Sequence, residues 1–194
     1  MKVLWISVTP DFLLGWSNEF TYKNLSFGFL LDFRKGGDIY SVTQAFGLDT
    51  GIMEITAVGD MRENGVVAGQ NALTHLTFKN EDGSINTTPV NPEEFWANGY
   101  NIREMAVFDG SYLKLREMHL TYTFPQKVLK SLKIVKAANI SVIANNVALL
   151  WTHKSNLLHL DPESTTGSTN TGVGFESNSY PPSRSIGMKL GVTF

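Results

Sequence analysis

Residues 11–34 read DFLLGWSNEFTYKNLSFGFLLDFR, and this stretch decides the fold. Apolar side chains occupy every second position in each half of it, with a single exception. Side chains at alternate positions of a β-strand lie on the same face of the sheet, so this pattern predicts strands that are apolar on one side. Only Lys23 and Asn24 separate the two halves. A tight polar turn between alternating runs predicts a hairpin with strands over 11–22 and 25–34.

Three further segments show the same alternation, over residues 111–124, 139–151 and 185–194. In the first of them the apolar positions change parity between Leu115 and Met118. A β-bulge, in which one strand contains an extra residue, would let the apolar side chains before and after it lie on the same face. The change of parity therefore predicts a bulge near residues 116–117. The sequence therefore predicts five antiparallel strands and an all-β fold.

The connections between these strands differ greatly in length. The turn at 23–24 is short, and the basic connector 126–136 has room for one helical turn. Residues 35–109 and 157–184 instead form two long segments without a continuous alternating pattern. Within the first, the sequence Asn-Pro-Glu-Glu at 91–94 predicts a helix start, with Asn as the cap and Pro at the first helical position.

Composition excludes several classes of protein. The 194 residues contain 42% hydrophobic side chains, so the chain is not a disordered one. A formal net charge of −2 argues against a nucleic-acid partner, which requires concentrated positive charge. The absence of cysteine removes disulfides and thiolate metal sites. No apolar run reaches the roughly 18 residues of a membrane-spanning helix, and residues 1–8 lack a signal-peptide cleavage site.

Three features together favour a β-barrel in a membrane. Charged residues of the predicted strands lie on the faces opposite the apolar ones, as Glu19, Asp32 and Lys189 do. This distribution suits lipid, where a charge at mid-bilayer costs about 2–4 kcal/mol. Short turns also alternate with long loops, which is typical of outer-membrane barrels. Finally, aromatic residues gather at the predicted strand ends, where a membrane interface favours them; they are Phe33, Trp151, Tyr22, Tyr122, Phe124 and Phe194.

Five strands do not close a barrel, because single-chain forms need about eight or more. In lipid, an open sheet would leave the backbone groups of its edge strands unpaired. We therefore expect this chain to be the C-terminal five strands of a larger transmembrane barrel, with loops 35–109 and 157–184 on the extracellular side.

Several motifs resemble those of one family, the SusC/RagA class of TonB-linked outer-membrane proteins (TonB-dependent receptors). They are DGSYLKLRE at 109–117, LTYTFP at 120–125, IANNVALLW at 143–151, LDPE at 160–163, YPPSR at 180–184 and GMKLGVTF at 187–194. TPDF at 9–12 and FTYKN at 20–24 fit the same family. The pattern departs from it at Asn145-Asn146, where the family has Gly-Gln, and over residues 1–7. The family's plug domain has no counterpart in this sequence.

The resemblance implies a barrel of about 22 strands in the Gram-negative outer membrane. It implies TonB-dependent uptake of large nutrients, which are glycans or oligosaccharides and sometimes peptides. The implied partners are a SusD-like surface lipoprotein, the TonB complex through N-terminal parts that this sequence lacks, and the barrel-insertion machinery. No cofactor and no enzymatic activity are expected.

Few side chains suggest a site. The alternating residues Met188, Leu190, Val192 and Phe194 resemble the terminal signal read by the insertion machinery. Trp96 and Tyr100 in the first long loop are candidates to stack on sugar rings or to contact a lipoprotein lid, with packing in the core of the loop as the alternative.

Neither a metal site nor a catalytic site is expected. The spacing of His153, His159, Asp161 and Glu163 matches no standard metal pattern. No residues form a catalytic pair, and His119 is expected to face the lumen of the barrel.

Two other functions remain open from the sequence. A soluble or surface β-sandwich that binds a ligand would also alternate, with its apolar faces buried against a second sheet. A siderophore-type TonB-dependent receptor would share the barrel but not the SusC-like motifs.

Overall fold

The computed structural model describes residues 6–67, 79–98, 101–131, 134–165 and 174–194. The elements are β1 (Phe12–Tyr22), β2 (Leu25–Lys35), β3 (Asp38–Ser41), α1 (Val42–Asp49), η1 (Glu54–Ala57), α2 (Met61–Asn64), β4 (Val66–Val67), β5 (Pro89–Val90), α3 (Pro92–Ala97), η3 (Arg103–Ala106), β6 (Val107–Asp109), β7 (Tyr112–Thr123), α4 (Gln126–Leu129), β8 (Ala137–Thr152), β9 (Phe175–Glu176) and β10 (Ser185–Thr193). They divide between two compact units, which we describe separately.

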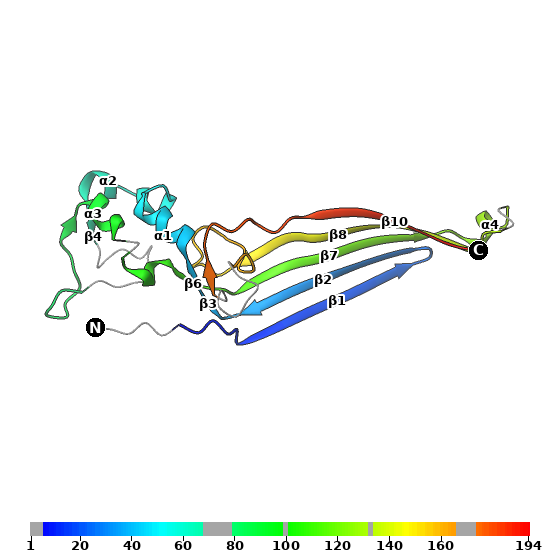
Figure 1. Ribbon diagram of the computed structural model, residues 1–194, viewed down its shortest axis with the longest axis horizontal. Coiled ribbons are helices and arrows are strands. Elements are labelled where there is room, and N and C mark those ends of the chain that lie inside the picture. The colour runs from blue at the N-terminus through cyan, green and yellow to red at the C-terminus, as the bar shows by residue number, and fades with distance from the viewer. Residues whose placement is uncertain (1–5, 68–78, 99–100, 132–133, 166–173) are drawn as a thin grey trace. The chain divides into compact units, whose positions relative to one another are not determined.

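The sheet unit contains residues 11–35, 111–152 and 181–194. Its five strands lie in the order β1-β2-β7-β8-β10, and every neighbouring pair is antiparallel (Figure 1). These strands begin and end within two residues of the five segments predicted from the alternation. Lys23 makes the tight turn of the hairpin with a positive φ of 56°. The amide of Asn24 donates a hydrogen bond of 2.9 Å to the carbonyl oxygen of Thr123 and so joins this turn to β7.

The predicted bulge in β7 is confirmed. Leu30 of β2 faces Glu117, but the next residue, Leu31, faces Leu115, so Arg116 has no partner position in β2. The pairing of β7 with β8 shifts at the same place. Because one extra residue is absorbed there, the apolar side chains of both halves of β7 stay on one face of the sheet.

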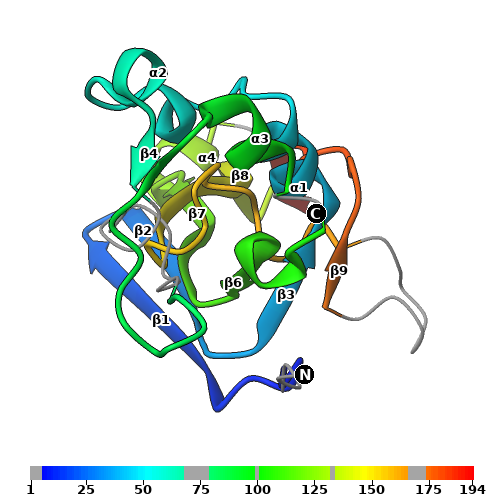
Figure 2. The same cartoon turned by 90° about the vertical axis from the view of Figure 1, so that its left-hand side faces the viewer.

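The loop unit contains residues 1–10, 36–110 and 153–180. The prediction of an all-β fold is wrong for this region, because the unit contains short helices in addition to the one predicted at 91–94 and has a hydrophobic core of its own. Side chains from α1, η1, β4, α3, η3 and the turn after α1 form that core; they are Leu48, Met53, Ile55, Val66, Phe95, Trp96 and Met105. Figure 2 shows α1, α2 and α3 in this unit. The predicted start of α3 is confirmed, since the side chain of Asn91 accepts hydrogen bonds from the backbone N–H groups of Glu93 and Glu94.

A small sheet joins distant parts of the loop unit. β3 pairs antiparallel with β6 and parallel with β9, which lies about 135 residues further along the chain. The carboxylate of Glu176 is buried beside the start of α1. It accepts a hydrogen bond of 2.7 Å from the hydroxyl of Thr43 and another from the hydroxyl of Ser41. Together with the backbone N–H of Thr43, these hydroxyl groups hold segment 153–180 to the start of α1 and stabilise the buried carboxylate, which also accepts a hydrogen bond from the N–H of Ser179.

The described helices are short. None of them is long and apolar enough to cross a membrane.

Candidate functional site

The largest feature of the sheet unit is a continuous apolar face, which we define by five rows of cross-strand neighbours. The rows are Leu14/Phe33/Leu113/Trp151, Trp16/Leu31/Leu115/Ala148, Asn18/Phe29/Met118/Ala144/Ile186, Phe20/Phe27/Leu120/Val142/Met188 and Tyr22/Leu25/Tyr122/Ile140/Leu190. Asn18 is the only polar side chain in these rows. Because side chains in register touch across a sheet, the alternation of five separate strands combines into a single surface.

The apolar face is largely uncovered among the described residues. Trp16 and Phe20 are 54% and 57% exposed, and Met188 on β10 is 75% exposed. Aromatic contacts run along the face instead of into a second layer: the ring of Phe29 lies 5.6 Å from that of Trp16 and 6.4 Å from that of Phe20. Water-soluble proteins rarely leave contiguous apolar surface of this kind open, so the face requires an apolar partner.

The opposite side of the sheet, which we call the polar face, carries the charged and hydroxyl side chains. Its rows are Gly15/Asp32/Lys114/Leu149, Ser17/Leu30/Glu117/Asn145/Ser185, Glu19/Gly28/His119/Ile143/Gly187 and Thr21/Ser26/Thr121/Ser141/Lys189. The register therefore places the charged side chains on the face opposite the apolar ones, as predicted.

Polar side chains on this face pair with one another. Asp32 forms an ion pair with Arg116, the extra residue of the bulge. The hydroxyl groups of Thr121 and Ser141 lie 2.8 Å apart. His119 packs against Gly28, since a Cβ atom added to this glycine would lie 2.3 Å from the imidazole. The polar face thus carries hydrogen-bonded and ionic contacts between neighbouring strands.

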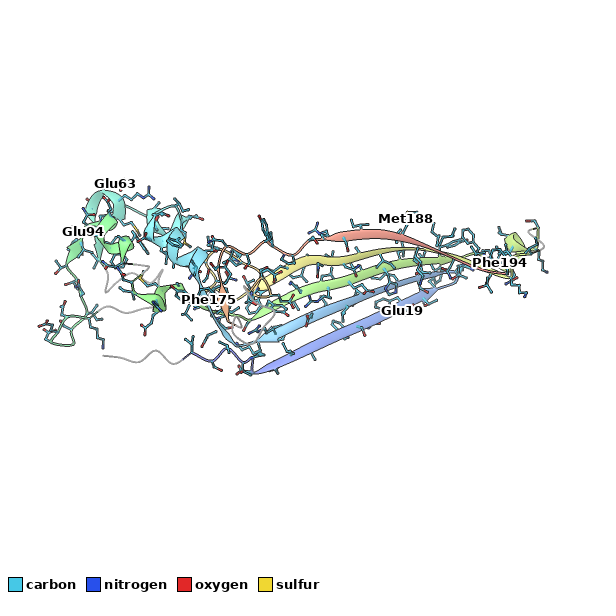
Figure 3. All side chains as sticks on the ribbon, in the orientation of Figure 1. Glu19, Glu63, Glu94, Phe175, Met188 and Phe194 are labelled. Carbon is cyan, nitrogen blue, oxygen red and sulfur yellow. The ribbon has the colours of Figure 1, made fainter. Side chains whose placement is uncertain are left out.

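Three of the residues proposed as a terminal signal, Met188, Leu190 and Val192, lie on the edge strand β10, and Phe194 follows directly after it. Met188, Leu190 and Phe194 are 75%, 67% and 69% exposed, and Val192 is 41% exposed. Figure 3 labels Met188 on β10 and Phe194 at the end of the chain. β10 pairs with β8 on one side, and no described strand pairs with its other side. The strand is therefore accessible along its outer edge, and its role in insertion stays a prediction.

Of the two aromatic residues proposed to contact a ligand, the structure describes only Trp96. Trp96 is only 3% exposed and belongs to the core of the loop unit, with its ring 4.9 Å from that of Phe95. The ring of Trp96 is therefore not open for a sugar to stack on. Its burial favours the alternative, in which Trp96 packs in the core of the loop. Tyr100 lies outside the described residues.

The histidines and carboxylates near 153–163 are not brought together. His153 contacts the hydroxyl of Ser155 at 2.8 Å, and Asp161 accepts a hydrogen bond from the backbone of Glu163. In the described parts of the chain, no group of three or more His, Asp or Glu side chains is placed to hold a metal ion.

Two features were missed by the sequence analysis. One is the contact of Asp32 with Arg116, which depends on the bulge and on strand pairing. The other is a cavity in the loop unit that brings together Asp49, Arg62 and Glu93. Nothing in the local pattern around these residues signals either arrangement, because their partners lie far apart in sequence.

Comparison with known proteins gives a consistent result. No family model matches the chain. Over 97% of its length it is 28% identical to TonB-dependent receptor P26 of Formosa agariphila, and over 96% it is 25% identical to TonB-dependent receptor P3 of the same organism. The chain spans only 17% and 16% of these relatives. The relatives are named as receptors and not as enzymes.

Solved structures agree on the fold. The chain is similar to a structure of the RagAB peptide transporter over 98% of its length, with 18% identity and a TM-score of 0.59, and covers 18% of that chain. It also matches the RagAB peptide importer in its open-open state, with 20% identity and a TM-score of 0.56, over 97% of this chain and 18% of that one. The resemblance seen in the motifs is thus confirmed: this chain is similar in sequence to TonB-dependent receptors and similar in fold to part of the RagAB importer.

Proposed function

We propose that this chain forms the C-terminal part of a transmembrane β-barrel in the outer membrane, within a TonB-dependent transporter of large nutrients. The observation that carries the proposal is the apolar face, which crosses all five strands and is largely exposed. Hydrocarbon is a partner for such a face, while the polar face suits an aqueous lumen.

The two edges of the sheet support a larger barrel. The outer edges of β1 and β10 have no partner strand among the described residues. Unpaired backbone groups in lipid cost several kcal/mol each, so further strands must continue the sheet on both sides. The chain covers about a sixth of its relatives, which leaves room for those strands.

The proposal also covers the side of the membrane on which each loop lies and the kind of nutrient that is transported. The loop unit, which contains most of 35–109 and 157–184, lies on the extracellular side, and the short turns at 23–24 and near α4 lie on the periplasmic side. The cargo is an oligosaccharide or other glycan, or a peptide, and a SusD-like lipoprotein serves as the partner at the surface. Energy comes from the TonB complex through other parts of the protein. The names of the relatives support dependence on TonB, and the name of the RagAB peptide importer supports uptake and a peptide as one kind of cargo.

The rival β-sandwich requires a second sheet over the apolar face. The sequence contains no cysteine, so single cysteines test the two readings directly. We choose Phe27→Cys on the apolar face and Ser26→Cys, its neighbour on the polar face, in the longer protein that carries this chain.

Each cysteine receives an environment-sensitive fluorophore, and vesicles with brominated acyl chains then quench it. We expect strong quenching at position 27 and little at position 26, because only the former contacts hydrocarbon. Equal quenching at the two positions, or a protein that stays monodisperse in buffer without detergent, would overturn the membrane assignment.

A further inference from the structure

One polar residue interrupts the apolar face of the sheet unit. Asn18 lies in the middle row, whose other members are Phe29, Met118, Ala144 and Ile186. The two end rows of the face begin at Leu14 and Tyr22, each four residues away from Asn18 along β1. At the usual rise and tilt of barrel strands, four residues span about 13 Å along the strand and about 10 Å along the membrane normal. Asn18 therefore lies deep within the apolar face.

The side-chain amide of Asn18 makes no hydrogen bond to any residue that the structure describes. Its neighbour across β2 is Phe29, and the residues before and after it on the same face of β1 are Trp16 and Phe20. The ring of Phe29 contacts the rings of Trp16 and Phe20 at 5.6 and 6.4 Å. Aromatic rings thus border Asn18 on three sides, although an amide carries both hydrogen-bond donors and an acceptor.

The fourth side of Asn18 is the outer edge of β1, with which no described strand pairs (Figure 1). In the proposed barrel, another strand continues the sheet at this edge. A residue of that strand in register with Asn18 would have its Cβ atom about 4.5–5.5 Å away, within reach of the amide. Water and lipid head groups lie beyond the end rows, and the side chain of Asn18 is too short to extend to them as lysine or arginine does.

We propose that the strand beyond β1 carries a hydroxyl or amide side chain in register with Asn18, and that these two side chains form a hydrogen bond on the lipid-facing surface. An unpaired amide in hydrocarbon costs free energy, and a neutral partner removes this cost. A charged partner does not fit, because a charge at this depth is itself costly. The inference rests on the proposed function, which supplies the hydrocarbon and the neighbouring strand.

A polar pair at this depth fixes the register between the two strands. A slip of one residue turns the apolar side chains of a strand to the other face, so alternation alone prevents it. A slip of two residues keeps every apolar side chain on the apolar face, so alternation does not prevent it. The pair at Asn18 does, because the slip would leave two polar side chains unpaired in hydrocarbon. Asn18 therefore selects one register at this edge of the sheet.

Asn18→Leu gives opposite results with and without a partner. Without one, the substitution removes a costly polar group from lipid and stabilises the protein. With one, it leaves the polar group of the partner unpaired and destabilises the protein. We expect the unfolding equilibrium of the longer protein in lipid vesicles to shift about three- to tenfold toward the unfolded state. Met118→Leu, in the same row on β7, is the matched control and should leave the equilibrium nearly unchanged.

Disulfide formation identifies the partner, because this chain contains no cysteine of its own. Asn18→Cys is combined in turn with single cysteines along the neighbouring strand of the longer protein, otherwise free of cysteine. The pair that oxidises most readily marks the position in register. We expect the native residue at that position to be Asn, Gln, Ser, Thr or Tyr. Its replacement by Leu together with Asn18→Leu should restore most of the stability that either single variant loses, because no polar group is then left unpaired.

Three results would overturn the inference. One is an Asn18→Leu variant that is as stable as the parent or more so, and another is an apolar or charged residue at the cross-linked position. The third is a disulfide between two copies of the Asn18→Cys protein in preference to any within one copy, which would place a second copy against this face. Each result would leave the membrane assignment standing, because that assignment depends on the quenching at position 27. Loss of that quenching would refute the proposed function instead.

Discussion

Phe29 offers the most direct quantitative test of the proposal that the apolar face contacts a membrane. It lies in the middle row of the apolar face, between Asn18 and Met118. Phe29→Arg places a cation there, which costs about 2–4 kcal/mol if the row lies at the middle of a bilayer. The substitution also removes ring contacts with Trp16, Phe20 and Phe27, each worth about 0.5 kcal/mol or more.

Phe29→Leu separates these two effects, because it removes the ring contacts but adds no charge. The difference between the Arg and Leu variants should be about 2–4 kcal/mol, a factor of roughly 30 to 1,000 in the folding equilibrium. Leu25→Arg, in the last row of the face, should cost only about 0–1 kcal/mol, because an end row lies near the interface.

The assay is guanidinium unfolding of the longer protein in lipid vesicles, followed by the tryptophan emission. Ser26→Arg on the polar face is the control and should cost about 0.5–1.5 kcal/mol, from the lost contact of 3.1 Å with the hydroxyl of Thr21. The reasoning is refuted if Phe29→Arg is tolerated as well as Ser26→Arg, or if the cost does not fall from the middle row to the last.

Three other predictions concern separate parts of the chain. Deletion of Phe194 should lower the amount of the parent protein inserted in the outer membrane, and normal surface levels by immunoblot would contradict this. Gly28→Ala should turn the imidazole of His119 aside, because its Cβ would lie 2.3 Å from the end of that ring, and should be more destabilising in the same unfolding assay than Gly15→Ala, whose Cβ has no atom within 4 Å. Hydrogen bonds from the hydroxyl and the backbone N–H of Ser84 lower the pKa of Asp82. Ser84→Ala should therefore raise the pKa of Asp82 in an NMR titration, and an unchanged pKa in the variant would contradict the cause given. The stability that Asp82 adds to this turn is present above its unfolded pKa and is lost as the pH falls through its folded pKa.

The sequence predicted those parts of the fold that depend on local patterns. Alternation with a period of two is a property of each strand alone, so β1, β2 and β10 were predicted closely. The start of α3 was predicted because its capping residue and its first turn are adjacent in the chain.

The loop unit was not predicted, because its order depends on contacts between distant residues. β3 pairs with β9 across about 135 residues, and each strand is too short to show a period. The hydrophobic core likewise takes Leu48 and Met105 from separate turns and helices. Trp96 was considered from the sequence as a ligand contact, but only the structure shows that its ring is buried while its N–H remains unpaired.

Because of the bulge at Arg116, β7 contains one residue more than its pairing with β2 uses. Leu115 and Met118 are three positions apart, yet they lie on the same side only because one residue between them is skipped by the pairing. Removing Arg116 would make the pairing with β2 continuous, so Leu113, Leu115 and Met118 would stay on the apolar face without a bulge. A deletion of one residue should therefore be accepted at the bulge, whereas one elsewhere in β7 would turn part of its apolar side chains to the polar face.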